Sequence, residues 1–81
     1  MIKVLFFAQV RELVNTASLP LAGSFENVAA LRAHLAAQGD RWALALDEGK
    51  LLAAVNQTLV ELTHPLADGD EVAFFPPVTG G

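Results

Sequence analysis

The stretch Glu71-Val72-Ala73-Phe74-Phe75-Pro76-Pro77 decides how the end of the chain folds. Residues 71–75 combine β-branched and aromatic side chains, which favours a strand. The two prolines end that strand, because proline has no N–H for the hydrogen-bond ladder of a sheet. Asp68-Gly69-Asp70 directly before it is a strong turn signal. We therefore predict a last strand over 71–75 that begins at a tight turn and ends at Pro76.

The start of the chain predicts a second strand of the same kind. Ile2–Ala8 is also rich in β-branched and aromatic residues, and its side chains alternate between two faces. One face carries Ile2, Val4 and Phe6, and the other carries Lys3, Leu5 and Phe7. By analogy with α+β folds, we expect the first and last strands to lie side by side in the middle of one sheet.

The sequence between these strands predicts further short elements. We expect a helical turn over 9–14 and strands over 17–21, 51–55 and 58–62. Pro20 places the strand that contains it at an edge of the sheet. Asn56-Gln57 is the expected turn between the last two of these strands.

The main helix is predicted by apolar residues at helical spacing after Asn27. Ser24 or Asn27 can cap its start by accepting a backbone N–H bond. Gly39 is expected to stop it in the left-handed conformation, which glycine adopts readily. Asp40 is expected to cap a second, shorter helix through Leu46. This order of elements predicts an α+β domain with one sheet and helices on one face.

Length and charge narrow the possible functions. The chain has 81 residues, no cysteine and 53% hydrophobic residues, so a single domain must be held by apolar packing alone. The formal net charge of −4 argues against nucleic acid and against an anionic membrane as partners, and it suits a protein partner with a basic groove. No apolar run is long enough for a membrane helix, and no export signal is evident, so a cytoplasmic location is expected.

Side chains suited to catalysis are few. His34 and His64 have no second ligand at metal spacing, and we interpret both as surface or structural residues, so no metal site is expected. The acidic stretch 68–71 contains Gly69 and is interpreted as a turn rather than a cation loop. Trp42 stands alone on its short helix and is assigned to the core.

The tail is the most specific candidate for chemistry. Pro76-Pro77 holds it extended, and Gly80-Gly81 can enter a channel too narrow for residues with side chains. No neighbouring side chain hinders attack at the carboxylate carbon of Gly81, although a carboxylate needs activation, for example as an acyl adenylate. A frayed, inert terminus is the alternative interpretation.

An apolar surface is expected beside the root of the tail. If Phe74 points into the core, Phe75 points outward, and Phe7 shares the outward face of the first strand. Leu59 is expected to join them. Exposed apolar patches mark partner surfaces. The alternative is that another layer, such as the turn over 9–14, covers these side chains.

Four segments make the whole sequence resemble the small subunits of molybdopterin synthase, a family of ubiquitin-like sulfur carriers. The segments are Ile2–Leu13, Asp40–Leu46, Leu51–Gln57 and Asp68–Gly81. The resemblance implies a β-grasp fold, in which a mixed sheet wraps one main helix. It implies a domain over residues 1–77 and a flexible Gly-Gly tail over residues 78–81.

The resemblance also implies a role in molybdenum cofactor biosynthesis. An activating enzyme would adenylate the Gly81 carboxylate with ATP, and sulfur would replace one oxygen to give a thiocarboxylate. The large synthase subunit would take in the tail, and the thiocarboxylate would donate sulfur to a cyclic pyranopterin precursor. Catalytic side chains are expected on the large subunit, in an assembly of two small and two large subunits, and no bound cofactor is expected on this chain.

The resemblance assigns partner contacts as well. Phe7, Arg11, Leu59 and Phe75 match family positions that contact both partners, and the tail residues taken in with Gly80 and Gly81 are Pro76, Pro77, Val78 and Thr79. Arg11 either pairs with an acid on a partner or is a solvated helix residue.

Three alternatives share the Gly-Gly end. A thiamine-pathway sulfur carrier has the same fold, but the chain length, the helix with Trp42 and the segment 74–77 favour the molybdopterin carrier. A ubiquitin-like modifier would form isopeptide bonds to lysines. A plain binding module would have an inert tail.

Overall fold

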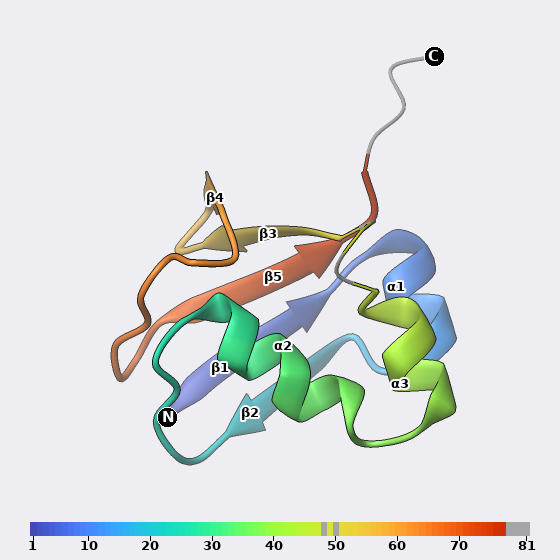
Figure 1. The fold of residues 1–81 in the computed structure, drawn as a ribbon, viewed down its shortest axis with the longest axis horizontal. Helices are drawn as coiled ribbons and strands as arrows, with labels where there is room; N and C mark the ends of the chain where they lie inside the picture. Colours follow the sequence, from blue (N-terminus) through green and yellow to red (C-terminus); the bar gives the residue numbers. More distant parts are fainter. Residues whose placement is uncertain (48, 50, 78–81) are drawn as a thin grey trace.

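The computed structural model describes residues 1–47, 49 and 51–77 (Figure 1). The elements follow one another as β1 (Ile2–Phe6), α1 (Ala8–Val14), β2 (Ser18–Leu21), α2 (Val28–Ala36), α3 (Asp40–Ala45), β3 (Leu52–Val55), β4 (Thr58–Val60) and β5 (Glu71–Phe75). The predicted tail over 78–81 lies outside the described residues.

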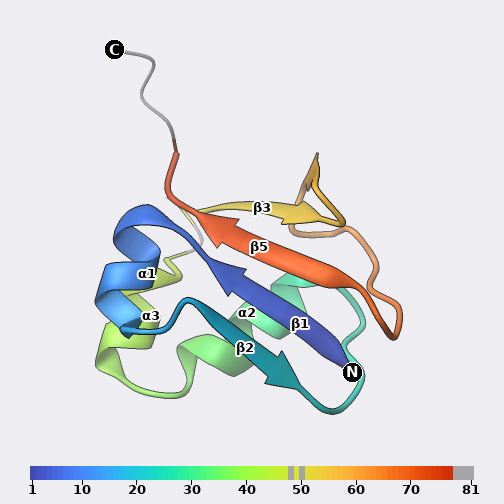
Figure 2. The same ribbon diagram turned by 180° about the vertical axis from the view of Figure 1, so that it is seen from behind.

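One mixed sheet holds all five strands in the order β2-β1-β5-β3-β4. The first and last strands pair in parallel, with Lys3 opposite Glu71 and Phe6 opposite Phe74. The other neighbours are antiparallel. This confirms the expected pairing of the chain's two ends in the middle of the sheet, which Figure 2 shows from behind. Pro20 lies in the edge strand β2, as predicted.

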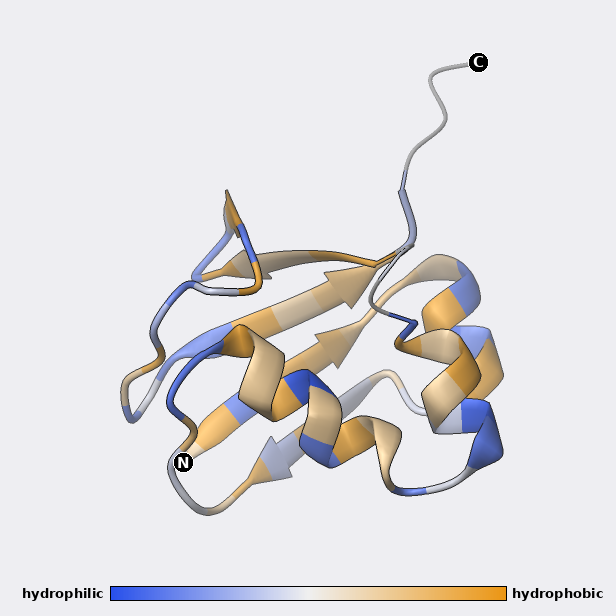
Figure 3. Cartoon of the chain, viewed as in Figure 1, coloured by the Kyte–Doolittle hydropathy of each residue, from blue (hydrophilic) through white to orange (hydrophobic). Residues whose placement is uncertain are grey.

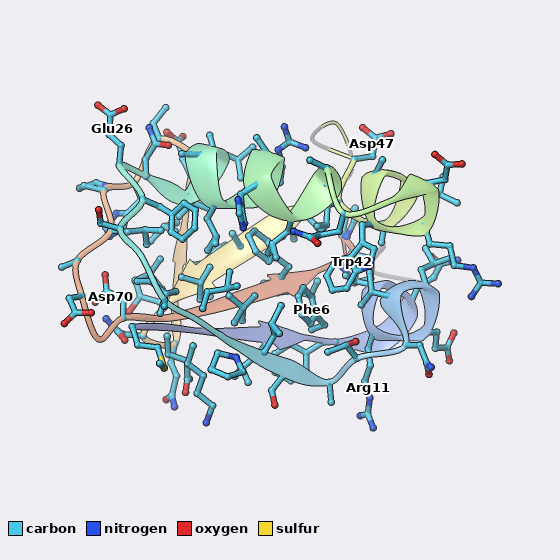
Figure 4. All side chains as sticks on the ribbon, turned by 90° about the horizontal axis from the view of Figure 1, so that it is seen from below. Phe6, Arg11, Glu26, Trp42, Asp47 and Asp70 are labelled. Carbon is cyan, nitrogen blue, oxygen red and sulfur yellow. The ribbon has the colours of Figure 1, made fainter. Side chains whose placement is uncertain are left out.

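The helices α2 and α3 cover one face of the sheet, whereas α1 follows the end of β1 and packs against α3 and β5 (Figures 1 and 4). Fully buried side chains from the inner face of the sheet, from α2 and from the C-cap of α3 form the core between the two layers, and the largest are Ile2, Val4, Phe6, Val28, Leu31, Leu35, Leu46, Val72 and Phe74. Trp42 contacts Phe6 edge-on, with ring centroids 5.5 Å apart, which confirms its assignment to the core. The architecture is the predicted α+β, β-grasp fold.

The hydropathy of the residues differs between the central strands and the turns that connect the elements. Figure 3 shows hydrophobic residues concentrated in β1, β3 and β5, whereas the connecting turns are mostly hydrophilic. The turn at Asn56-Gln57 has positive φ at both residues, 50° and 71°, as a tight β-hairpin requires. Gly69 adopts φ 91° in the turn before β5 and donates its backbone N–H to the Met1 carbonyl at 2.9 Å. Both predicted turns are therefore confirmed.

The prediction that Gly39 stops the main helix was wrong. The helix ends at Ala36 with a right-handed cap at Ala37, and the N–H of Gln38 reaches the Leu35 carbonyl at 3.0 Å. Because these bonds already satisfy terminal carbonyls, no left-handed glycine is needed, and Gly39 has an extended φ of 164°. Gly39 instead precedes α3, so Asp40 is the first residue of that helix and its side chain makes no cap bond.

Four predicted strands were one or two residues too long, and one cap is now assigned. The strands predicted over 17–21 and 51–55 begin one residue later, at Ser18 and Leu52. The first strand ends at Phe6, because Ala8 turns into the left-handed region with φ 51° and begins α1. The strand predicted over 58–62 ends at Val60, because the Leu62 carbonyl instead accepts a bond from the N–H of Ala29 at the start of α2. Of the two candidate caps, Asn27 is the one that accepts a side-chain bond, from the N–H of Ala30 at 2.9 Å.

Candidate functional site: the open sheet face and the root of the tail

The face of the sheet opposite α2 and α3 carries no other layer among the described residues. Strand alternation sends Phe6, Val72 and Phe74 inward, where each is 0–1% exposed. The residues between them point outward and are partly or fully exposed. On β5 these outward residues are Glu71, Ala73 and Phe75, so the strand that leads to the tail contributes to both faces.

Register gathers the apolar outward residues at one end of this face. Leu5 lies opposite Ala73, Ala73 opposite Ala54, and Ala54 opposite Leu59, which gives one apolar row across four strands. A second row pairs Phe75 with Leu52. We call this surface, together with Phe7, the apolar strip; its members are Leu5, Phe7, Leu52, Ala54, Leu59, Ala73 and Phe75.

Phe7 extends the strip beyond the end of β1. Its backbone is still extended, with φ −127° and ψ 155°, so the alternation of β1 continues for one more residue. Its N–H donates to the Phe74 carbonyl at 3.2 Å, which fixes it beside the end of β5. The side chain is 47% exposed, and Leu59 is 63% exposed. The alternative that another layer covers the strip is therefore wrong for Phe7 and Leu59, whereas Phe75 is only partly exposed.

The other end of the open face is polar. Lys3 and Glu71 face each other across β1 and β5, with Nζ and Oε2 3.9 Å apart. The strip is therefore bounded on one side by this ion pair, and on the other by the root of the tail.

Arg11 lies in the last turn of α1 and is exposed. Figure 4 shows its side chain pointing away from α2 and α3, toward the side of the open face. Within the described part of the chain it makes no ion pair. A cation is thus available beside the apolar strip for a carboxylate of another molecule.

The root of the tail is Pro76-Pro77, which follows β5 directly. Pro76 is half-buried and Pro77 is exposed. Figures 1 and 2 show this segment leaving the sheet at the end where β1 passes into α1. The other predicted tail residues, Val78, Thr79, Gly80 and Gly81, lie outside the described residues.

Sequence reasoning missed a groove on the other side of the same root. The groove lies between α1 and α3, has a volume of about 450 Å³, and is lined by Gln9, Val10, Leu13, Leu44, Ala45, Asp47, Pro76 and Pro77. Among the described lining residues, Leu44 is the large hydrophobic side chain that is exposed, at 66%. The local sequence does not predict the groove, because Leu44 stands in an apolar run in which Trp42, Ala45 and Leu46 are buried or half-buried.

The remaining candidates have structural roles. The His34 ring packs against Phe25 with centroids 5.2 Å apart. Hydrogen bonds from the Ala67 N–H at 2.8 Å and from the Asn56 amide at 3.0 Å hold the pKa of Asp70 below its usual value, so this carboxylate stabilises the turn before β5. Across residues 1–47, 49 and 51–77, no three His, Asp or Glu side chains gather as metal ligands, and no helix has the length and apolar character needed to cross a membrane.

Known proteins resemble this chain in sequence and in fold. The sequence matches the ThiS family over residues 4–81. It is 75% identical to the molybdopterin synthase sulfur carrier subunit of Escherichia coli and 57% identical to that of Haemophilus influenzae, in both cases over the full length of both chains. A solved complex of subunits 1 and 2 of the molybdopterin-converting factor from Helicobacter pylori contains a chain that is 29% identical, with a TM-score of 0.66 and coverage of 99% of this chain and 97% of that one.

Proposed function

This chain belongs to the ThiS family, and from that premise we propose that it is the sulfur carrier subunit of a molybdopterin synthase. The observation that carries the proposal is the 75% identity, along both whole chains, to the Escherichia coli subunit of that name. The same observation favours this function over that of a thiamine-pathway carrier with the same fold.

The Gly81 carboxylate is the group that carries sulfur. One of its oxygens attacks the α-phosphorus of ATP on an activating enzyme, and pyrophosphate leaves with the electron pair of the broken bond. Hydrosulfide from a sulfur donor then attacks the activated carbonyl carbon, and AMP leaves. The product is a thiocarboxylate, which is a better nucleophile than the carboxylate and is ionised at neutral pH.

The shape of the chain supports this chemistry. The proline pair at the root cannot continue the sheet, so Pro76 and Pro77 lead the chain out of it after β5. Glycines at the tip let the reacting carbon pass through a narrow channel into a partner's active site. The thiocarboxylate sulfur attacks a carbon of the cyclic pyranopterin precursor held by the large subunit, and the carbon–oxygen bond at that carbon breaks with its electron pair leaving on oxygen. Water then cleaves the acyl–sulfur bond of the resulting thioester, which leaves the sulfur on the pterin and returns the Gly81 carboxylate.

The apolar strip is the surface by which partners hold the carrier. Burial of apolar area provides most of the driving force for such association, and aromatic residues near the centre of an interface contribute most strongly. Phe7 and Phe75 stand beside the root, so a partner seated on them is positioned to receive the tail. Arg11 at the margin selects partners with an acid in the matching place.

Both partners need the same tail, so they bind in turn. The activating enzyme loads the carrier and releases it, and the large subunit then binds it. We place these events in the cytoplasm, which remains a prediction of the sequence.

The intact mass of the chain tests the proposal. We expect incubation with ATP, the activating enzyme and a sulfur donor to give a species heavier by one oxygen-to-sulfur exchange, mapped to Gly81. A variant with one alanine added after Gly81 is the control, because it keeps the fold and displaces the reacting carboxylate. An unchanged mass for the natural chain would contradict the proposal, and Gly81 joined to lysine in peptide maps would indicate a protein modifier instead.

A further inference from the structure

We propose, resting on the function above, that the groove between α1 and α3 is a second contact for the large synthase subunit, which fills it with an apolar side chain flanked by a cation. The activating enzyme does not use this groove. The large subunit therefore holds the root of the tail from both sides, whereas the activating enzyme holds it from the sheet side alone.

Leu44 is the first reason. The large hydrophobic side chains exposed among the described residues are Met1, Phe7, Leu44 and Leu59. Phe7 and Leu59 belong to the apolar strip, and Met1 begins the sequence. Leu44 makes no contribution to the core, because the inward side chains of α3 and its cap are Trp42, Ala45 and Leu46. Leu44 also does not stand alone, because the half-buried Leu13 and the two prolines line the same groove, and a contiguous apolar patch of this kind marks a partner surface.

Continuity with the root of the tail is the second reason. Val10 and Leu13 of α1, Leu44 and Ala45 of α3, and both prolines line the groove. A partner that takes in the tail must lie against Pro76-Pro77, so it already reaches the wall of the groove. An apolar side chain of that partner can therefore enter the groove and bury Leu44 and Leu13 while the partner stays in the position from which it takes in the tail.

Charge supplies the third reason and specifies the contact. Asp47 and Gln9 are the polar members of the lining, and no cationic side chain is among the described residues of the groove. Figure 4 shows Asp47 on the helix side of the molecule and Arg11 on the opposite side. The partner's surface must therefore be basic beside the groove and acidic beside the strip, which fixes the orientation of the carrier.

The difference in lifetime selects the large subunit as the occupant. The activating enzyme must release the carrier before the tail can reach the synthase, and transient contacts are small. For the synthase, subunits 1 and 2 of the molybdopterin-converting factor from Helicobacter pylori have been solved as one complex. Persistent interfaces are larger and more apolar, so the additional apolar surface suits the large subunit.

The test compares two exposed positions of the same helix. Leu44→Asp places a charge in the groove, and Ala43→Asp, outside its lining, controls for charge and helix propensity. We expect Leu44→Asp to raise the Kd for the purified large subunit about tenfold or more, as loss of a central apolar contact does. The activating enzyme should still accept Leu44→Asp: in ATP–pyrophosphate exchange, the KM for this variant should stay within about twofold of the KM for the natural chain. Ala43→Asp should change neither the Kd for the large subunit nor this KM.

A second variant keeps the test valid if Leu44→Asp fails to fold. Asp47→Asn removes the charge but retains an oxygen for the Gly49 N–H, which Asp47 now accepts at 3.0 Å. We expect a Kd about threefold higher, through slower association at low salt, as for a charge at an interface rim.

The outcomes separate this inference from the proposed function. An unchanged Kd for both groove variants, or an equal loss with the activating enzyme, would overturn the inference while the sulfur-carrier role stands. If the natural chain itself does not bind the large subunit, the proposed function fails and the inference fails with it.

Discussion

Phe74 and Phe75 are neighbours in β5 and have opposite roles. Phe74 is fully buried, and its ring stacks on Phe6 with centroids 6.4 Å apart. Phe75 is partly exposed and lies opposite Leu52 on the open face. The same side chain therefore supports the fold at one position and a partner surface at the next. Position along the strand, rather than residue type, determines whether the phenylalanine faces the core or the partner surface, because the side chains of a strand alternate between the two faces.

Phe74→Ala should have the largest effect on stability. Removing a buried phenylalanine typically costs about 3–5 kcal/mol, and small domains have roughly 5–15 kcal/mol in total. We expect the denaturant midpoint to fall sharply, and partner binding to fall only in proportion to the unfolded fraction. A midpoint near that of the natural chain would show that Phe74 is not the centre of the core.

Phe75→Asp should produce the reverse pattern. The carboxylate remains in contact with water on the open face, so the free energy of unfolding should change by less than about 1 kcal/mol. Binding to the large subunit should weaken by at least about tenfold, because a charge replaces an aromatic side chain in the apolar strip. Titration calorimetry alongside thermal melting measures both quantities. A melting temperature as low as that of Phe74→Ala would remove the distinction between the two faces.

A substitution of Asp70 tests the turn before β5, which belongs neither to the core nor to the apolar strip. The pKa of Asp70 is lowered by hydrogen bonds from Ala67 and Asn56 in the folded state, so its stabilising contribution is complete above the ordinary value of 3.8 and is lost as pH falls through the lower folded value. We expect stability to decline in that acidic range, and Asp70→Asn to make the decline shallower. Urea unfolding at several pH values measures it. Asp70→Asn should bind the large subunit at neutral pH as tightly as the natural chain does. Weaker binding by this variant would place the turn in the interface.

Ala8→Gly should have the smallest effect. Ala8 holds φ 51°, which costs an L-residue about 1 kcal/mol or more. Glycine relieves this strain but also loses more chain entropy on folding, so we expect a net gain in stability of less than about 1 kcal/mol. Thermal melting measures it. A decrease would mean that the alanine methyl packs usefully where β1 passes into α1.

The central strands and the turns could be predicted from the sequence because local signals agreed there. Alternation, proline punctuation and the Asn56-Gln57 and Asp68-Gly69-Asp70 turns all favoured the same elements. Gly39 and Asp40 were misassigned because the signals for one helix end and the next helix start stand side by side, and only the backbone conformation shows which helix each residue serves.

The two sides of the candidate site differed in how far they could be predicted. Phe7, Phe75 and Leu59 follow from strand alternation, so their exposure was expected. The groove with Leu44 did not follow, because it depends on how α1 and α3, which are separated in the sequence, pack against each other and against Pro76-Pro77. Periodicity in a helix as short as Asp40–Ala45 cannot separate an outward leucine from an inward one.

The parallel pairing of β1 with β5 has a consequence for synthesis of the chain. The central pair joins residues 2–6 to residues 71–75, so the sheet cannot close until β5 has been made. Without β5, strands β2-β1 and β3-β4 are two separate hairpins with no neighbour in common. Contacts of such high sequence separation slow folding. The sheet and its apolar strip are therefore complete only in chains that extend through Phe75, and a truncation before β5 removes the partner surface together with the fold.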